Sequence, residues 1–118
     1  MKIISGKYKG RNLDGHNLDG TRPTMERVKE SLFAIIQNHL DNAIVLDLFS
    51  GSGNLGIEAI SNGARGTYFV DINPVCIKVI KDNIRMFKIE EESFVIKNDY
   101  ITVGKWGNQS FEGMWYKV

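Results

Sequence analysis

The sequence has 118 residues, of which 42% are hydrophobic and 25% charged, with a formal net charge of +1. These values are typical of one globular domain with a real core, and they exclude disorder of the whole chain. No apolar run approaches the roughly 20 residues of a membrane span, so an integral membrane protein is excluded. The first residues lack the apolar stretch of a secretory signal, so we expect none. The single cysteine, Cys76, can form neither an internal disulfide nor a cysteine-based metal site, so we expect a cytoplasmic protein without a metal.

The basic charge is concentrated at the N-terminus. Residues 1–11 carry four Lys or Arg side chains and no acid, whereas the remaining chain has a net charge of −3. A basic arm on a mildly acidic body is a plausible contact for nucleic acid, although a solvated surface arm would have the same charge. Apolar residues mixed with Gly6 and Gly10 predict a small β-hairpin or arm over residues 1–13, followed by a loop over 14–22.

Pro23 opens a helical pattern that predicts a helix over about residues 24–40. Its buried face is expected at 3.6-residue spacing, at Met25, Val28, Leu32, Ile35, Ile36 and Leu40. The almost continuous apolar run 43–49 predicts a parallel strand covered on both faces, and residues 55–60 predict a short helix that ends at Gly63.

A second strand is predicted over residues 67–72, and Asn73-Pro74 is a typical helix start. The helix that follows is expected to bury Ile77, Ile80, Ile84 and Phe87 and to expose Lys78, Lys81, Arg85 and Lys88 to solvent. Residues 90–92 form a linker, and residues 93–97 a third strand. Beyond Tyr100 we expect no further strand, because residues 104–118 show no sustained periodicity.

This order of elements predicts two successive βαβ units. They would form a parallel sheet with right-handed crossovers, the first half of a Rossmann-like doubly wound α/β fold. We therefore divide the chain into a basic arm (1–22), a Rossmann-like half-domain (23–103) and an atypical tail (104–118).

One glycine-rich segment has the pattern of a nucleotide-binding turn. Gly51-Ser52-Gly53-Asn54-Leu55-Gly56 matches G-x-G-x-x-G after a buried strand and at the opening of a helix. Glycines at these positions let the backbone turn tightly and approach a ligand. Asp71, 20 residues after Gly51, is placed to accept hydrogen bonds from ribose hydroxyls. A purely structural strand-to-helix turn is the alternative.

Asp47 decides between cofactors. A dinucleotide would bring a pyrophosphate to this turn, and a carboxylate beside it would repel that charge. S-adenosylmethionine instead carries a sulfonium and an α-amino group, which suit an acid at the strand end. Asp99, after the third strand, adds an acceptor where an adenine amino group could donate. Asp47, Asp71 and Asp99 thus form an acidic rim at the carboxyl edge of the predicted sheet.

Three separate blocks resemble, in the same order, the bacterial small-subunit (16S) rRNA guanine-N2 methyltransferase family. They are residues 1–11, residues 21–33 and the run Val45-Leu46-Asp47-Leu48-Phe49-Ser50-Gly51-Ser52-Gly53-Asn54-Leu55-Gly56-Ile57-Glu58-Ala59. The resemblance extends from residue 1 to about residue 103. It implies a class I methyltransferase fold, S-adenosyl-L-methionine as the methyl donor, and a guanine exocyclic amine in 16S rRNA of the assembling 30S particle as the acceptor.

The resemblance also implies roles for residues at matching positions. Asp47 to Gly53 would line the methionine end of the cofactor, Asp71 would hold the ribose, and Asp99 with Tyr100 would flank the adenine. Thr24 would lie near the mouth of the cofactor site or cap its helix. The expected cofactor-binding residues are Asp47, Phe49, Ser50, Gly51, Ser52, Gly53, Asp71, Ile72, Asp99 and Tyr100, and the expected RNA-binding residues are Lys7, Lys9, Arg11, Arg22 and Arg27.

Enzymes of this family act through an Asn/Asp-Pro-Pro-Tyr/Phe loop after a fourth strand. This sequence has only Pro23 and Pro74, so we expect a C-terminally truncated member that binds cofactor without methyl transfer. Its first strand would then have an unpaired apolar flank, through which the chain could self-associate. The alternatives are a non-catalytic remnant that binds RNA, a non-functional fragment, and an NAD-dependent oxidoreductase fragment.

Overall fold

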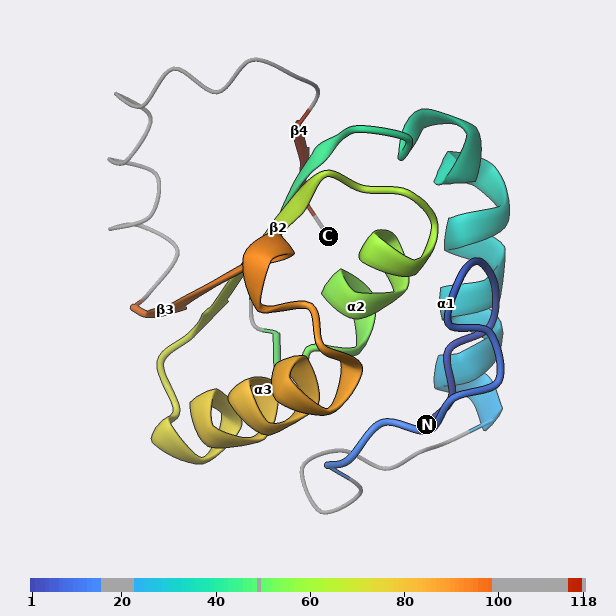
Figure 1. Cartoon of the computed structure of the whole chain (residues 1–118). Coiled ribbons are helices and arrows are strands. Elements are labelled where there is room, and N and C mark those ends of the chain that lie inside the picture. The colour runs from blue at the N-terminus through green and yellow to red at the C-terminus, as the bar shows by residue number, and fades with distance from the viewer. Residues whose placement is uncertain (16–22, 49, 99–114, 118) are drawn as a thin grey trace.

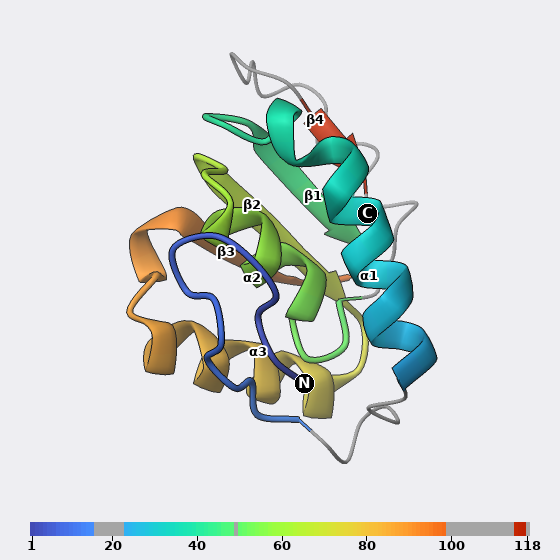
Figure 2. The same cartoon turned by 90° about the vertical axis from the view of Figure 1, so that its right-hand side faces the viewer.

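The computed structural model describes residues 1–15, 23–48, 50–98 and 115–117. Figures 1 and 2 show a parallel sheet with the α-helices packed on one of its faces. The elements are α1 (Pro23–Ile36), the 3₁₀ helix η1 (Gln37–His39), β1 (Ile44–Leu48), α2 (Asn54–Ser61), β2 (Gly66–Asp71), α3 (Pro74–Phe87), the 3₁₀ helix η2 (Glu90–Glu92), β3 (Ser93–Lys97) and β4 (Trp115–Lys117).

The two predicted βαβ units are present. The sheet has the order β3-β2-β1-β4, with β1 parallel to β2 and β2 parallel to β3. Asn73 caps α3 as predicted, because its side chain accepts a hydrogen bond from the Val75 amide and Pro74 occupies the first turn. All four residues predicted for the buried face of α3 are buried. Within the described residues, no helix is long and apolar enough to cross a membrane.

The buried face predicted for α1 is only partly correct, because Leu40 is buried and Leu32 and Ile36 are partly buried. Val28 and Ile35 are 58% and 74% exposed, whereas Lys29 and Phe33 are buried. The helix is rotated so that Lys29 reaches Glu58 of α2, and the apolar pattern could not show this because Lys29 was counted as polar. The helix also ends four residues before the predicted end, since η1 replaces its last turn.

The structure also corrects the expectation that no strand follows Tyr100. β4 pairs in parallel with β1, in the register Ile44↔Trp115, Val45↔Tyr116 and Leu46↔Lys117. A strand of three residues is too short to produce a periodic pattern, which explains why the sequence did not reveal it. Because β1 is paired on both sides over these positions, the predicted unpaired flank is absent there, and with it the reason for expecting self-association through that flank.

The N-terminal segment, residues 1–14, is part of the main core. It folds back on itself through the antiparallel bridge Lys2↔Asn12, a reduced form of the predicted hairpin. Ile3 and Leu13 are buried in one cluster with residues of α2 and α3, among them Ile57 and Phe87. Figure 2 shows the segment lying over α2 and beside α3. Its basic side chains therefore start from a fixed backbone.

Candidate cofactor-binding site

The glycine-rich turn joins β1 to α2 at the carboxyl edge of the sheet. Gly53 precedes the first residue of α2 and has a φ of 84°, a conformation that favours glycine. Ser50 connects the turn to β1 and β2, because its hydroxyl donates to the Asp47 carbonyl at 2.6 Å and accepts from the Val70 amide at 3.1 Å. The turn is thus held against the ends of β1 and β2, the place where open α/β sheets bind ligands.

Asp47 is a buried carboxyl group beneath this turn. Its Oδ2 accepts a hydrogen bond from the Gly56 amide at 3.0 Å, but its Oδ1 has no partner among the residues that the structure describes, although Asp47 is only 1% exposed. Burial raises the pKa of Asp47 from 3.8 to about 7, and the Gly56 amide opposes this only in part. An unpaired buried carboxylate oxygen is costly, and such atoms in a native structure call for an explanation, such as a role in binding or an ordered water.

Gly56 permits the close approach of α2 to β2. A Cβ at this position would lie 2.3 Å from the Phe69 ring and 2.7 Å from the Thr67 methyl group. Both neighbours are fully buried, so neither can move away without disturbing the core. The third glycine of the turn is therefore required for packing, and its amide also supports Asp47.

We expect Gly56→Ala to lower the free energy of unfolding by about 1–3 kcal/mol, because overpacking outweighs the roughly 1 kcal/mol that alanine gains in a helix. Urea unfolding of the variant and of the wild type gives the difference. Ser31→Ala, at an exposed position of α1, serves as the control and should change the stability by less than about 0.5 kcal/mol. A Gly56→Ala protein as stable as the wild type would contradict the tight packing.

Asp71 lies beside the turn at the end of β2. Its Oδ2 accepts from the Gly51 amide at 3.0 Å and its Oδ1 from the Asn73 amide at 2.9 Å. Each carboxylate oxygen has a second lone pair, so both can still accept a hydrogen bond from a ligand hydroxyl. Ile72 and Val75 follow with exposed fractions of 62% and 57%, and they provide apolar surface next to this acid.

The structure thus brings Asp47, the turn from Ser50 to Gly53, Asp71 and Ile72 to one edge of the sheet. Phe49, Asp99 and Tyr100 lie outside the described residues. The grouping fits an adenosyl ligand with a cationic amino-acid end: an unpaired buried carboxylate oxygen, a backbone that approaches closely at the glycines, an acid for ribose hydroxyls and exposed apolar surface beside it.

Lys7, Lys9 and Arg11 of the N-terminal segment lie at the end of the molecule away from the turn. The Lys7 amide donates to the carbonyl of Ser61, the last residue of α2. The Arg11 guanidinium stacks 4.1 Å from the Phe87 ring and donates to the Met86 carbonyl, at the end of α3. Both helices start at the carboxyl edge of the sheet and end at the opposite edge. Lys7 and Arg11, and Lys9 between them, are therefore separated from the turn by the length of α2.

Arg27 lies on the side of the molecule that carries the turn. It is exposed in α1, two residues before Lys29, whose amino group contacts Asn54 at the start of α2. Arg22 lies outside the described residues, as does the side-chain environment of Thr24. The predicted RNA-binding residues that the structure describes therefore do not form one patch.

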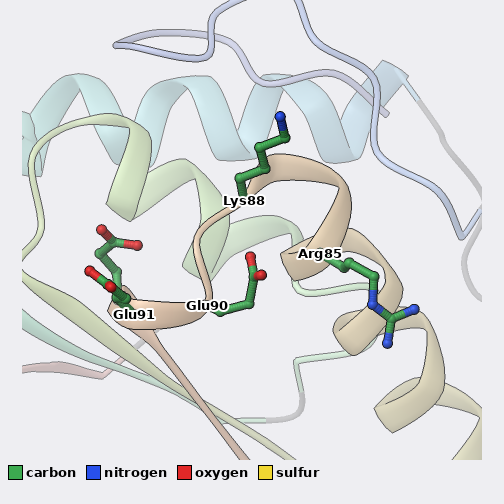
Figure 3. A pocket seen from close by; sticks show the side chains of 5 residues that line it. Arg85, Lys88, Glu90 and Glu91 are labelled. Carbon is green, nitrogen blue, oxygen red and sulfur yellow. The ribbon is translucent and has the colours of Figure 1, made fainter.

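A surface hollow of about 500 Å³ lies at the carboxyl end of α3, away from the turn. Arg85 and Lys88 line it together with Glu90, Glu91 and Glu92, and Figure 3 shows these acidic and basic side chains around it. Their mixed charge gives no preference for an anion or a cation. In the part of the chain that the structure describes, no three His, Cys, Asp or Glu side chains are grouped to hold a metal ion.

Two buried polar residues near the turn were missed at the sequence level. Lys29 and Asn83 are 2% and 0% exposed, and both form hydrogen bonds to the turn or to the residue that follows it. The signal was available for Asn83, a polar residue on the otherwise apolar face of α3 formed by Ile80, Ile84 and Phe87. Such a residue needs partners when it is buried.

The sequence matches a known protein family and several methyltransferases. A family model described as "Conserved hypothetical protein 95" matches residues 1–112. "Putative rRNA methyltransferase YlbH" of Bacillus subtilis is 42% identical over 99 residues, which cover 84% of this chain and 54% of that protein. "Ribosomal RNA small subunit methyltransferase D" of Haemophilus influenzae is 36% identical over 98 residues, covering 83% of this chain and 51% of that protein.

Solved structures show the same architecture. "Putative methyltransferase yhhF" from Escherichia coli has a TM-score of 0.78 at 29% identity and is matched over 87% of this chain and 55% of its own. A methylase structure from Haemophilus influenzae has a TM-score of 0.67 at 29% identity, over 94% of this chain and 57% of its own. The Rossmann-like methyltransferase fold is therefore confirmed, and the chain spans about half the length of the curated relatives it matches.

Proposed function

The chain belongs to the Conserved hypothetical protein 95 family, and from this premise we propose that it binds S-adenosyl-L-methionine at the carboxyl edge of β1 and β2 as part of an rRNA methyltransferase. The observation that carries the proposal is the buried, unpartnered Oδ1 of Asp47 beneath a glycine-rich turn. A cationic ligand group would complete the environment of this oxygen, whereas a phosphate would be repelled by it.

The proposal assigns a separate task to each part of the site. Asp47 faces the methionine end of the cofactor, where the positive charges are. Asp71 accepts hydrogen bonds from the ribose hydroxyls, and Ile72 supports the adenine through its exposed side chain. Phe49, Asp99 and Tyr100 complete the site in this proposal. The cofactor supplies the methyl group for transfer.

We further propose that the acceptor is the exocyclic N2 amine of a guanine in 16S rRNA of the assembling 30S particle, in the cytoplasm. Relatives named ribosomal RNA small subunit methyltransferase D support RNA of the small ribosomal subunit as the substrate class. Arg27 is exposed in α1, two residues before Lys29, whose amino group contacts the residue after the turn, and would meet phosphates near the modified base, together with Arg22. Lys7, Lys9 and Arg11 would contact a more distant part of the RNA, because they lie at the other end of α2.

Methyl transfer by the 118-residue chain itself is not part of the proposal. The sequence has two prolines, Pro23 and Pro74, and so lacks the paired prolines of the loop that orients the amine in enzymes of this type. Incubating the chain with 30S particles and labelled cofactor should give no labelled rRNA. Incorporation of the label would overturn this part of the proposal.

Isothermal titration of the chain with S-adenosylhomocysteine and with NAD tests the cofactor assignment. We expect binding of S-adenosylhomocysteine and none of NAD. Asp71→Asn should weaken this binding by about tenfold, because the ribose loses a charged acceptor. Asp41→Asn, a change at an exposed acid before β1, is the matched control and should leave the affinity unchanged. A folded wild-type chain that binds no S-adenosylhomocysteine at millimolar concentration, or prefers NAD, would reject the assignment.

A further inference from the structure

The glycine-rich turn is tied to the N-terminal segment by two buried side chains. Asn83 of α3 is 0% exposed. Its Oδ1 accepts from the Asp14 amide at 2.9 Å, and its Nδ2 donates at 2.9 Å both to the Asp14 carbonyl and to the Ser52 carbonyl in the middle of the turn. A single amide therefore joins the end of the segment to the turn.

Lys29 of α1 makes a corresponding connection on the other side of the turn. Its amino group donates to the Lys2 carbonyl at 2.8 Å and to Asn54 Oδ1 at 2.6 Å, and Asn54 directly follows the turn. The bridge between Lys2 and Asn12 holds the two ends of the segment together. The turn is thus supported on both sides by residues whose other partners are in the N-terminal segment.

These contacts differ in kind from those at the far end of the segment. There, the Ser61 hydroxyl accepts from the Tyr8 amide at 2.9 Å and donates to the Ser5 carbonyl at 2.7 Å. Ser61 is the last residue of α2, so these bonds dock the segment without a contact to the turn. The segment is therefore attached at its two ends through residues that support the turn, and at its middle through a residue that does not.

We propose that Asn83 is a positioning residue for the cofactor site. It holds Ser52 of the turn in its binding conformation and is itself held in place by Asp14 of the N-terminal segment. The proposal rests on the function proposed above. The physical basis of this proposal is the pair of hydrogen bonds that Asn83 Nδ2 donates. A side chain at position 83 that cannot donate them would leave the Ser52 and Asp14 carbonyls without this buried partner, and the turn would relax.

Asn83→Asp tests the assignment, since it keeps the shape and the acceptor for the Asp14 amide but removes both donors. We expect it to weaken binding of S-adenosylhomocysteine by about tenfold or more in isothermal titration, at a temperature where circular dichroism shows a folded protein. Asn83→Ser introduces no charge and should also weaken binding of S-adenosylhomocysteine. It provides a second test of the assignment if Asn83→Asp does not fold.

Ser61→Ala is the matched control, because it loosens the same segment at the end away from the turn. We expect its affinity to stay within about twofold of the wild type even if its thermal stability falls. Wild-type affinity in folded Asn83 variants, or an equal loss in Ser61→Ala, would overturn the positioning role. Failure of the wild type to bind would instead reject the cofactor assignment, so the two outcomes are distinct.

Discussion

Lys29→Met is expected to lower the free energy of unfolding by about 3–5 kcal/mol, because it leaves the buried carboxylate of Glu58 without its counter-charge. The two side chains are 1% and 0% exposed, and the Lys29 amino group lies 3.0 Å from Glu58 Oε1. Urea unfolding at pH 7 measures the effect. Since domains of this size have stabilities of about 5–15 kcal/mol, this change would remove a large part of the total.

Glu58 is a junction for three parts of the chain. Its carboxylate accepts from the amides of Ile4 and Ser5 at 2.9 and 3.0 Å, and from the Asn62 side chain at 3.3 Å, in addition to Lys29. Burial lowers the pKa of Lys29 below its ordinary value, and Glu58 opposes this shift. The pair therefore holds the N-terminal segment, α1 and α2 together, and loss of either charge affects all three.

Two controls separate this effect from a general effect of losing a lysine. Lys78→Met breaks an ion pair with Asp82 of the same 3.0 Å length, but Lys78 is 78% exposed, so the expected loss is below about 0.5 kcal/mol. The double variant Lys29→Met with Glu58→Gln removes both buried charges and should be more stable than Lys29→Met alone. Equal losses in Lys29→Met and Lys78→Met would contradict the structural importance of the buried pair.

The parts of the fold that the sequence predicted are those with local signals. The buried run of β1, the glycine-rich turn and the cap at Asn73 each depend on residues close in sequence, and the structure has all three. The acids at the ends of β1 and β2 were placed on one sheet edge by topology alone, which the structure supports for Asp47 and Asp71. Parallel pairing makes such juxtapositions predictable.

Features that depend on tertiary contacts could not be predicted in this way. The face that α1 buries is decided by the partner of Lys29 in α2, a residue 29 positions away. The place of Arg11 is decided by Phe87, so the charge of the N-terminal segment was visible in the sequence but not its distance from the turn. The same holds for Asn83, whose three hydrogen bonds reach residues 31 and 69 positions away.

Asp47→Asn is expected to abolish the pH dependence of stability that Asp47 causes. In the folded wild type its pKa is about 7, against an ordinary value of 3.8, so between these values the folded state keeps a proton that the unfolded state has released. Stability from this group is therefore highest at low pH and falls as the pH rises toward 7. Relative to the wild type, the variant should gain about 2–3 kcal/mol between pH 5 and pH 8. Urea unfolding at both values measures the gain, and Asp41→Asn should show none.

Cofactor binding should follow the opposite trend, because only the ionised carboxylate attracts a cation. In the wild type, the affinity for S-adenosylmethionine is expected to rise by about tenfold from pH 6 to pH 8, as the ionised fraction of a group with a pKa of about 7 rises. Titrations near pH 7 in two buffers of different ionisation enthalpy should reveal proton release on binding. Asp47→Asn should bind weakly at every pH and release no proton. A wild type whose affinity is constant over this range would show that Asp47 is not the group that meets the positive charge of the cofactor, whatever its effect on stability.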